Sequence, residues 1–434
     1  MNRLFVLLLT LALSGSASAQ LHLPSLRLPS GPGALDSLRR PAQQLVDRVD
    51  LPDLRALRLD QAGALLRRHP DVLEADPRGE PAVRGEILAW TSSAAGYAAA
   101  LGAARAAGLR VVREDRFDEL GEVLVVLAVP AGGATAGLLE RLRTLDPEGR
   151  YDFNHIYTGS GGAGLADAAS IPRPSVAHAA GPDASPRLGL VDSGVDAGHR
   201  ALRDAAVHPW GCGGEPHPDT HGTAVAALMV GRDDGFRGAA PGASLYAADI
   251  YCASPTGGSA ERIAAALGWL AREQVPVINL SLVGPPNQAL ERMVAAMVRR
   301  GHLLVAAVGN DGPAAPPLYP ASYPGVVGVT AVDRHGRPLP EAARGPQVLF
   351  AAPGNDMVSA APGSPPYRSV RGTSFAAPIV AGLLAPALAR PDPVRARDAV
   401  AALARQAGDA STISNTIGHG IVGADLRTDA GRLR

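Results

Sequence analysis

Three polar residues far apart in the chain have the side-chain types of a nucleophilic triad. Asp192 ends the apolar run of LGLVDSG, His221 opens the helical pattern of DTHGTAVAALM, and Ser374 precedes the apolar run of RGTSFAAPIVAG. An aspartate can orient an imidazole, the imidazole can accept a hydroxyl proton, and the hydroxyl can then attack a carbonyl carbon. Each residue alone is more simply explained as a cap of a strand or helix end. Together, in this order, they predict acyl-transfer chemistry.

A fourth polar residue fits the same reaction. Asn310, in VAAVGNDG, follows an apolar run, and its side-chain amide could donate a hydrogen bond to a developing oxyanion. The backbone N–H of Ser374, at the positive end of its predicted helix, could be the second donor. A capping role is again the simpler explanation for Asn310 by itself, but four coincidences in a consistent order favour a catalytic site.

The elements that must position these residues form an alternating pattern. Short, continuously apolar runs end in Gly, Ser, Asp or Asn, and amphipathic helical patterns lie between or after them; the runs are PRLGLVDSG, ASLYAADIY, VPVINLSL, HLLVAAVGN and GVVGVTAV. This pattern predicts an α/β fold, a parallel sheet with helices on both faces. In such sheets, ligands bind at the carboxyl ends of the strands, where these polar residues stand.

An upstream segment predicts a second, smaller α/β unit. GEILAW, RVVRED, EVLVVLAV and YDFNHIY resemble strands, and SAAGYAAALGAARAAG and TAGLLERLRTL resemble helices, giving the order βαββαβ. The GSGGAG that follows formally matches a dinucleotide-binding pattern. Because no good helix starts at its end, a flexible linker is favoured.

The motifs around these residues resemble the signature stretches of the subtilisin family of serine peptidases, over about residues 185 to 385. The resemblance implies that Asp192, His221 and Ser374 form the catalytic triad and that Asn310 belongs to the oxyanion hole. It also implies a subtilisin-like parallel sheet preceded by a βαββαβ propeptide that assists folding and leaves its tail in the active-site cleft. No cofactor is then required for catalysis. Structural calcium is common in the family, but the sequence does not identify ligands for it.

The chain is therefore expected to divide into five segments. Residues 1–19 have the charged start, apolar stretch and small-residue cleavage site of an export signal, and no later run is long and apolar enough to span a membrane. The expected segments are a helical, Pro-rich extension (20–85), the propeptide (86–158), a Gly-rich linker (159–180) and the peptidase domain (181–425). Self-cleavage is expected between Gly159 and Ser170.

The resemblance also indicates a substrate-binding segment. NLSLVGP, containing Ser281, Leu282, Val283 and Gly284, resembles the family segment that pairs with substrate backbone. Val283 stands where Gly is frequent, and Leu318, in the stretch that resembles the pocket base, stands where a small residue is frequent. Added volume predicts a preference for small residues on the acyl side of the cleaved bond.

The two cysteines and their neighbours leave two further interpretations. In an exported protein Cys212 and Cys252 could form one disulfide, although spacing alone does not prove that they meet. Alternatively, HPWGCGGEPHPDTH could hold zinc through Cys, His and Glu side chains. The spacing matches no standard finger, and zinc would remove His221 from the triad, so the metal interpretation is disfavoured.

Composition limits the partners. Acidic and basic residues balance to a net charge of zero, and no basic stripe with interleaved aromatics is present, which disfavours nucleic-acid binding. The expected partners are protein or peptide substrates and the propeptide itself, with the enzyme exported to the periplasm or medium. The competing hypothesis is a secreted pseudoprotease that grips peptides without cutting them. A lipase-like hydrolase is disfavoured because GTSFA lacks the second Gly of GxSxG.

Overall fold

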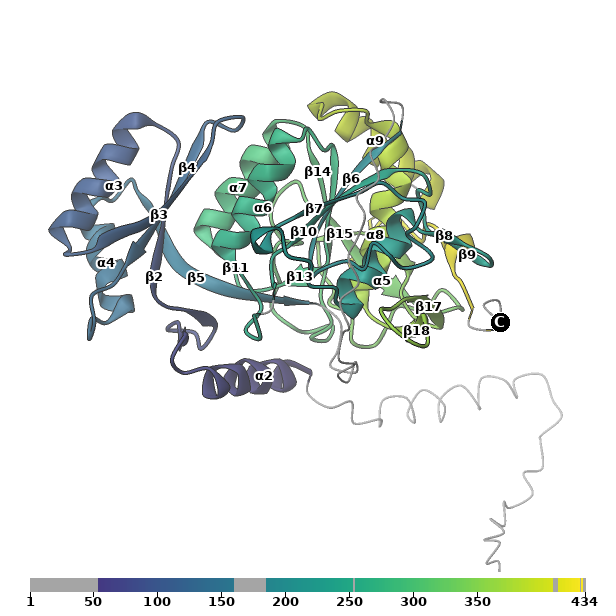
Figure 1. Cartoon of the computed structure of the whole chain (residues 1–434), viewed down its shortest axis with the longest axis horizontal. Helices are drawn as coiled ribbons and strands as arrows, with labels where there is room; N and C mark the ends of the chain where they lie inside the picture. The colour runs from purple at the N-terminus through teal and green to yellow at the C-terminus, as the bar shows by residue number, and fades with distance from the viewer. Residues whose placement is uncertain (1–53, 160–184, 253, 409–412, 430, 432–434) are drawn as a thin grey trace, which may run out of the picture. The chain divides into compact units, whose positions relative to one another are not determined.

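The computed structural model describes residues 54–159, 185–252, 254–408, 413–429 and 431, which are the coloured parts of Figure 1. The predicted export signal, the first part of the predicted extension and the predicted linker beyond Gly159 lie outside the described residues. No helix in the described ranges is long and apolar enough to cross a bilayer.

The N-terminal layer, residues 54–159, is an antiparallel sheet with two helices on one face (Figure 1). Its strands run in the order β5-β2-β4-β3, and β1 pairs with β2. The elements from β2 to β5 follow the βαββαβ order that the sequence predicts. The bounds are α2 Leu54–Arg68, β1 Leu73–Ala75, β2 Pro81–Thr91, α3 Ala94–Ala106, β3 Arg110–Phe117, β4 Glu122–Ala128, α4 Thr135–Leu145 and β5 Arg150–Gly159.

This layer starts further upstream than the sequence indicated. Strand β2 begins at Pro81, before the expected boundary at residue 86, and β1 pairs with it antiparallel. Leu65 of α2 and Leu73 of β1 are buried together with Ile156 of β5. The last part of the expected extension is therefore packed against the small α/β fold, because its few apolar side chains find partners there.

The second part of the chain is built on a seven-stranded sheet in the order β16-β15-β14-β12-β6-β10-β7, with every neighbouring pair parallel. This confirms the predicted parallel α/β architecture. The strands are β6 Arg187–Asp192, β7 Val207–Trp210, β10 Ser244–Asp249, β12 Val277–Leu280, β14 Leu303–Ala307, β15 Val327–Val332 and β16 Val348–Pro353.

Helices cover both faces of this sheet, as continuously apolar strands require. Along β14, for example, Leu303 and Val305 are buried on the face of α5, α8 and α9, whereas Leu304 and Ala306 are buried on the face of α6 and α7. The helices are α5 Thr220–Val230, α6 Ala260–Arg272, α7 Gln288–Arg299, α8 Thr373–Leu384 and α9 Pro393–Ala407.

Short elements complete the described fold. They include β11 and β13, which pair with the end of β5. Their bounds are β8 Arg232–Asp233, β9 Phe236–Arg237, β11 Gly258–Ser259, β13 Leu282–Val283, β17 Met357–Ala360, β18 Tyr367–Val370 and the 3₁₀ turns η1 Cys212–Gly214, η2 Ala385–Ala387 and η3 Ala424–Leu426.

The N-terminal layer buries its second face against α6 and α7. Leu88 and Trp90 of β2, with Leu124 of β4, belong to the apolar cluster that contains buried side chains of these helices, whereas Ile87 and Ala89 pack towards α3 and α4. At this junction Gly268 of α6 lies so close to Phe117 that a Cβ added to the glycine would overlap the aromatic ring.

Replacing Gly268 by Ala should therefore destabilise the chain, although Ala is intrinsically the better helix residue. We expect a loss of about 1–3 kcal/mol in unfolding free energy from the forced repacking. The control is Gly102→Ala in α3, where an added Cβ meets nothing within 4 Å and the helix propensity should raise stability by up to about 1 kcal/mol. Urea unfolding in a Ser374→Ala background, which prevents the expected self-cleavage, measures both. Equal effects of the two substitutions would contradict the packing argument.

Candidate active site

Asp192 and His221 are joined directly. Asp192 is the last residue of β6, and His221 is the second residue of α5. The Nδ1–H of His221 donates to Oδ1 of Asp192 at 2.7 Å, and the two side chains are 15% and 2% exposed. The short contact and the burial fix the orientation of the imidazole and place its proton on Nδ1, so that Nε2 is the basic nitrogen.

A second set of hydrogen bonds holds this pair in place. Asp219 caps α5 by accepting the N–H of His221 at 2.8 Å, and its Oδ1 also accepts the hydroxyl of Ser193 at 2.8 Å. The N–H of Ser193 donates to Asp192 at 2.7 Å, and the N–H of Gly222 donates to Ser193 Oγ at 3.0 Å. The start of α5 is thereby tied to the end of β6 on both sides of the imidazole.

The environment of His221 favours its protonated form. Burial lowers the pKa of the imidazole, but the charge and hydrogen bond of Asp192, followed by the charge of Asp219, raise it, and the net pKa lies above the ordinary value. Nε2 of His221 is buried and has no hydrogen-bond partner among the described residues. The ring therefore presents a basic nitrogen whose proton affinity is strengthened by two carboxylates.

Ser374 lies at the start of α8, one residue before the ring that packs near the imidazole. It is the second residue of the helix and is fully buried, and its carbonyl accepts the hydroxyl of Ser281 at 2.8 Å. The ring of the next residue, Phe375, has its centroid 5.4 Å from that of His221. The residue before the helix, Gly372, has φ 132°, a value that an L-amino acid rarely adopts. A glycine here lets the chain turn sharply into α8.

Asn310 is oriented by the same helix start. Its Oδ1 accepts the N–H of Thr373 at 3.1 Å, and the Oγ1 of Thr373 accepts the N–H of Gly309 at 3.2 Å. With the amide oxygen used in this way, the amide nitrogen is left as the donor. Nδ2 is buried and lacks a hydrogen-bond partner in the described part of the chain. The geometry leaves a pre-oriented donor next to Ser374, as an oxyanion site requires.

The end of β5 lies between two short strands, β11 and β13, and we call the space between these two strands the groove. Ile156 and Tyr157 pair antiparallel with β11, while Thr158 and Gly159 pair antiparallel with β13. A Cβ added to Gly159 would lie 3.7 Å from the imidazole of His221. The chain's own strand thus runs between two groove walls and reaches the imidazole.

The residues expected to bind substrate line this groove. Ser281 contacts the carbonyl of Ser374, Leu282 and Val283 form β13, and Gly284 pairs with Tyr319. Leu318 is buried against Gly309. A Cβ added to Gly309 would overlap Leu318 and come within 3.6 Å of Val283, so these two side chains fill the space next to Asn310.

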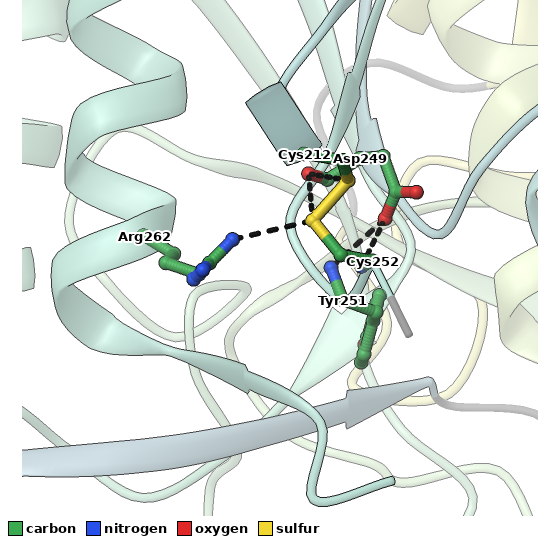
Figure 2. The surroundings of a disulfide bond; sticks show 5 residues. All are labelled: Cys212, Asp249, Tyr251, Cys252 and Arg262. Carbon is green, nitrogen blue, oxygen red and sulfur yellow. Dashed lines mark hydrogen bonds between the residues drawn. A yellow bond between two sulfur atoms is a disulfide. The ribbon is translucent and has the colours of Figure 1, made fainter. Parts of the chain in front are cut away.

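Cys212 and Cys252 form a disulfide, with an S–S distance of 2.08 Å (Figure 2). It ties the segment after β7 to the segment after β10, at the strand end where Asp249 lies opposite Asp192 in the sheet. Figure 2 also shows Asp249 accepting the N–H groups of Tyr251 and Cys252. The disulfide thereby fastens the loop that leads to β11, one wall of the groove.

The disulfide argues against the zinc alternative, since it uses the Cys212 thiol that would have to bind the metal. Among the described residues, the cluster of potential metal ligands is Cys212, Asp249 and Cys252, two of which are that disulfide. His208, another residue of the proposed zinc stretch, stacks on Tyr246.

Sequence reasoning missed several residues around the site. Asp219 and Ser193 carry the network behind His221, and the Asp two residues before His221 is a recognisable helix cap. Arg58 of α2 was also missed: its guanidinium bridges Glu80 at 3.0 Å and Asp311, next to Asn310, at 3.2 Å. No local pattern could reveal this contact, because its partners are far apart along the chain.

Comparisons with known proteins agree on one family. The model of the subtilase family matches residues 183–420, more than half of the chain. Subtilisin DY of Bacillus licheniformis is 34% identical over 210 residues, which are 46% of this chain and 76% of that protein. Subtilisin Savinase of Lederbergia lenta is 40% identical over 168 residues, 38% of this chain and 61% of its own length.

The fold is also shared with a solved structure. Fervidolysin from Fervidobacterium pennivorans, described as a keratinolytic enzyme related to subtilisin, matches with a TM-score of 0.63 at 20% identity. The match covers 82% of this chain and 62% of that one. The chain thus spans less than two thirds of Savinase and of fervidolysin, and this last likeness supports the fold alone.

The pH dependence of activity tests the electrostatics of His221. Asp219→Asn keeps a side chain that can cap α5 but removes a charge that raises the pKa of His221. Because a general base must be unprotonated, activity should rise as pH passes the pKa of His221, and the variant should reach its plateau at lower pH than the wild type. The profile of kcat/KM against pH measures this.

The control for this measurement is Asp392→Asn, the same substitution at the N-cap of α9. In this control the rise of kcat/KM on the acidic side should occur at the same pH as in the wild type. An Asp219→Asn profile that is unmoved, or moved to higher pH, would contradict the proposed role of the second carboxylate.

Proposed function

The chain belongs to the subtilase family of serine peptidases, and from this premise we propose that it is an exported endopeptidase, made as a zymogen, that works through Asp192, His221 and Ser374. The proposal is supported by the buried Asp192–His221 hydrogen bond, by the Phe375 ring near that imidazole, and by the hydrogen bond from the Thr373 N–H to Asn310 at the start of α8. In this proposal the four residues serve as orienting acid, base, nucleophilic hydroxyl and oxyanion donor of one reaction.

The reaction follows from these positions. Nε2 of His221 takes the hydroxyl proton of Ser374 as Oγ bonds to the substrate carbonyl carbon, and Asp192 stabilises the imidazolium. The oxyanion is held by Nδ2 of Asn310 and the backbone N–H of Ser374, at the positive end of α8. His221 then gives its proton to the leaving amine as the C–N bond breaks. A water molecule, deprotonated by His221, hydrolyses the acyl-enzyme and frees Ser374.

The groove supports a zymogen. Extended substrates bind such grooves by main-chain pairing. Here β5 pairs with the strands that form the two walls, β11 and β13, and its last residue lies next to the imidazole of His221. We propose that residues 86–158, with the upstream elements packed on them, act as the inhibitor, and that cleavage falls between Gly159 and Ser170. Of that stretch, Gly159 alone is among the described residues.

Export and substrate class complete the proposal. The export-signal pattern of residues 1–19 and the disulfide fit an oxidising compartment outside the cytoplasm. The side chains of Leu318 and Val283 beside Gly309 favour small residues on the acyl side of the cleaved bond. Proteins or peptides are the proposed substrates.

Replacing the nucleophile tests catalysis and self-processing together. When the full chain is expressed with its leader, we expect the wild type to be converted to a shorter form and Ser374→Ala to accumulate as the precursor. Ser369→Ala, an exposed serine on β18, is the control and should mature normally. N-terminal sequencing of the secreted species identifies the cleaved bond. Maturation of Ser374→Ala would show that another protease makes the cut.

The same proteins distinguish the enzyme from a pseudoprotease. A fluorophosphonate should label the mature wild type and fail to label Ser374→Ala, because only an activated hydroxyl reacts. A wild type that binds peptides but resists labelling would favour the peptide-binding module.

The oxyanion assignment has its own test. Asn310→Ala removes the amide donor and should lower kcat by about 10²–10³ with a small effect on KM, the size of loss known for such a donor in subtilisin. Asn355→Ala serves as the control for an Asn-to-Ala change outside the site. A kcat for Asn310→Ala within about twofold of wild type would remove Asn310 from the oxyanion site.

A further inference from the structure

The side chain of Tyr157, in β5, packs outside its own layer, among residues of the second part of the chain. It is fully buried and belongs to the apolar cluster formed with α6 and α7. Its hydroxyl donates to the carbonyl of Pro285 at 2.6 Å. The ring therefore packs in an apolar environment while its hydroxyl donates to a polar acceptor. A Phe or Leu side chain would leave that acceptor without a donor.

The ring fits because the groove wall lacks a side chain at one point. A Cβ added to Gly284 would overlap the Tyr157 ring. On the opposite wall Tyr157 pairs with Gly258, and a Cβ on Gly257 would approach the Tyr157 carbonyl to 2.7 Å. Glycines on both walls thus let the strand lie close and let a large flat ring turn inwards.

The backbone around Pro285, whose carbonyl accepts the Tyr157 hydroxyl, is held on both sides. Gly284 is held by two backbone hydrogen bonds to Tyr319, with N···O distances of 2.9 and 3.1 Å. Three residues after Gly284, Asn287 caps α7, and its N–H donates to the hydroxyl of Tyr323. Pro285 lies between these two anchors, so its carbonyl is held at a set depth rather than on a free loop.

Backbone pairing explains how a substrate would take the same path. The main-chain bonds of β5 to β11 and β13 do not depend on side chains, so they can hold any extended peptide, and side-chain pockets must supply the selectivity. Tyr157 stands two residues before Gly159, the residue beside His221. A substrate chain in this register places one side chain where Tyr157 lies.

We propose that the mature enzyme selects tyrosine at the substrate position that Tyr157 occupies in the precursor, with the Pro285 carbonyl accepting the phenol and Gly284 admitting the ring. This inference rests on the proposed function, because the groove must be vacated by β5 before a substrate enters. The discrimination works because a Phe in the same place would bury the Pro285 carbonyl without a donor, and sites that read a hydroxyl reject analogues that lack it.

The test uses the mature enzyme and quenched fluorescent peptides that differ at this one position, which is the fourth residue on the acyl side of the cleaved bond when cleavage follows the residue after Gly159. The peptides carry Tyr, Phe or Ala there, and mass spectrometry confirms the cleaved bond. We expect kcat/KM for Tyr to exceed that for Phe by about tenfold, the size of one buried hydrogen bond to a fixed acceptor. Ala should be cleaved less efficiently than Phe, since it leaves the apolar space unfilled.

A substitution in the wall provides the matched experiment. Gly284→Ala places a methyl group where the ring lies, so the ratio of kcat/KM for Tyr over Ala should fall to about one or below. Gly198→Ala is the control, because its added Cβ meets just one side-chain oxygen, that of Asp196, at 3.3 Å. Its Tyr-over-Ala ratio should match the wild type.

The outcomes separate the inference from the function on which it rests. If the wild type cleaves all three peptides with equal efficiency, the tyrosine pocket is overturned while the peptidase stands. Equal cleavage of Tyr and Phe, with Ala lower, overturns the role of the Pro285 carbonyl. If no peptide is cleaved and a fluorophosphonate labels nothing, the proposed function itself fails. The wild-type series decides the hydroxyl question even if Gly284→Ala does not fold.

Discussion

The hydrogen bond between Asp192 and His221 is the contact on which the arrangement of the site depends. It joins the end of a central strand to the start of a buried helix, and both partners are withdrawn from water. A carboxylate in this place would be costly without compensation. The compensation comes from the imidazole and from the backbone N–H of Ser193. The pair therefore fixes the imidazole and, through Asp219, the first turn of α5.

Close approach of the backbone makes this junction feasible. A Cβ on Gly222, directly after His221, would overlap the carbonyl of Ser193. The glycine is thus required for α5 to reach the end of β6, quite apart from any preference of the helix. At the other helix start, Thr373, the residue before Ser374, is hydrogen-bonded to both Gly309 and Asn310. Each helix start is thus tied to a strand end, and the proposed catalytic residues stand at these two junctions.

Much of this could be predicted from the sequence, because the signals are local and periodic. The strands ending at Asp192 and near Asn310, and the helices α4 and α9, stand where the apolar patterns placed them. The edge strands β7 and β16 were missed. VHPW is short and contains a proline that suits an edge strand, and VLFAAP has no helix between it and β15 to mark the crossover.

Long-range contacts were the other limit. Nothing near Arg58 in the sequence points to Asp311, and nothing near Tyr157 points to the Pro285 carbonyl. The packing of residues upstream of 86 could not be predicted for a related reason. Leu65 and Leu73 are isolated apolar residues in a polar stretch, and their burial becomes evident only in the structure, where they pack with Ile156. Residue types and spacing identified the chemistry, while the contacts that tune it required coordinates.

Strand β5 has a place in two assemblies at once, since it pairs with β2 inside its own layer and continues between β11 and β13. Such a strand cannot be peeled away singly, because its first half is held by an inner neighbour and by the packing on α6 and α7. Cutting the chain after Gly159 would leave every one of these pairings intact. In the proposed zymogen, scission and departure would consequently be two separate events, with the delay between them set by how long the severed layer stays folded.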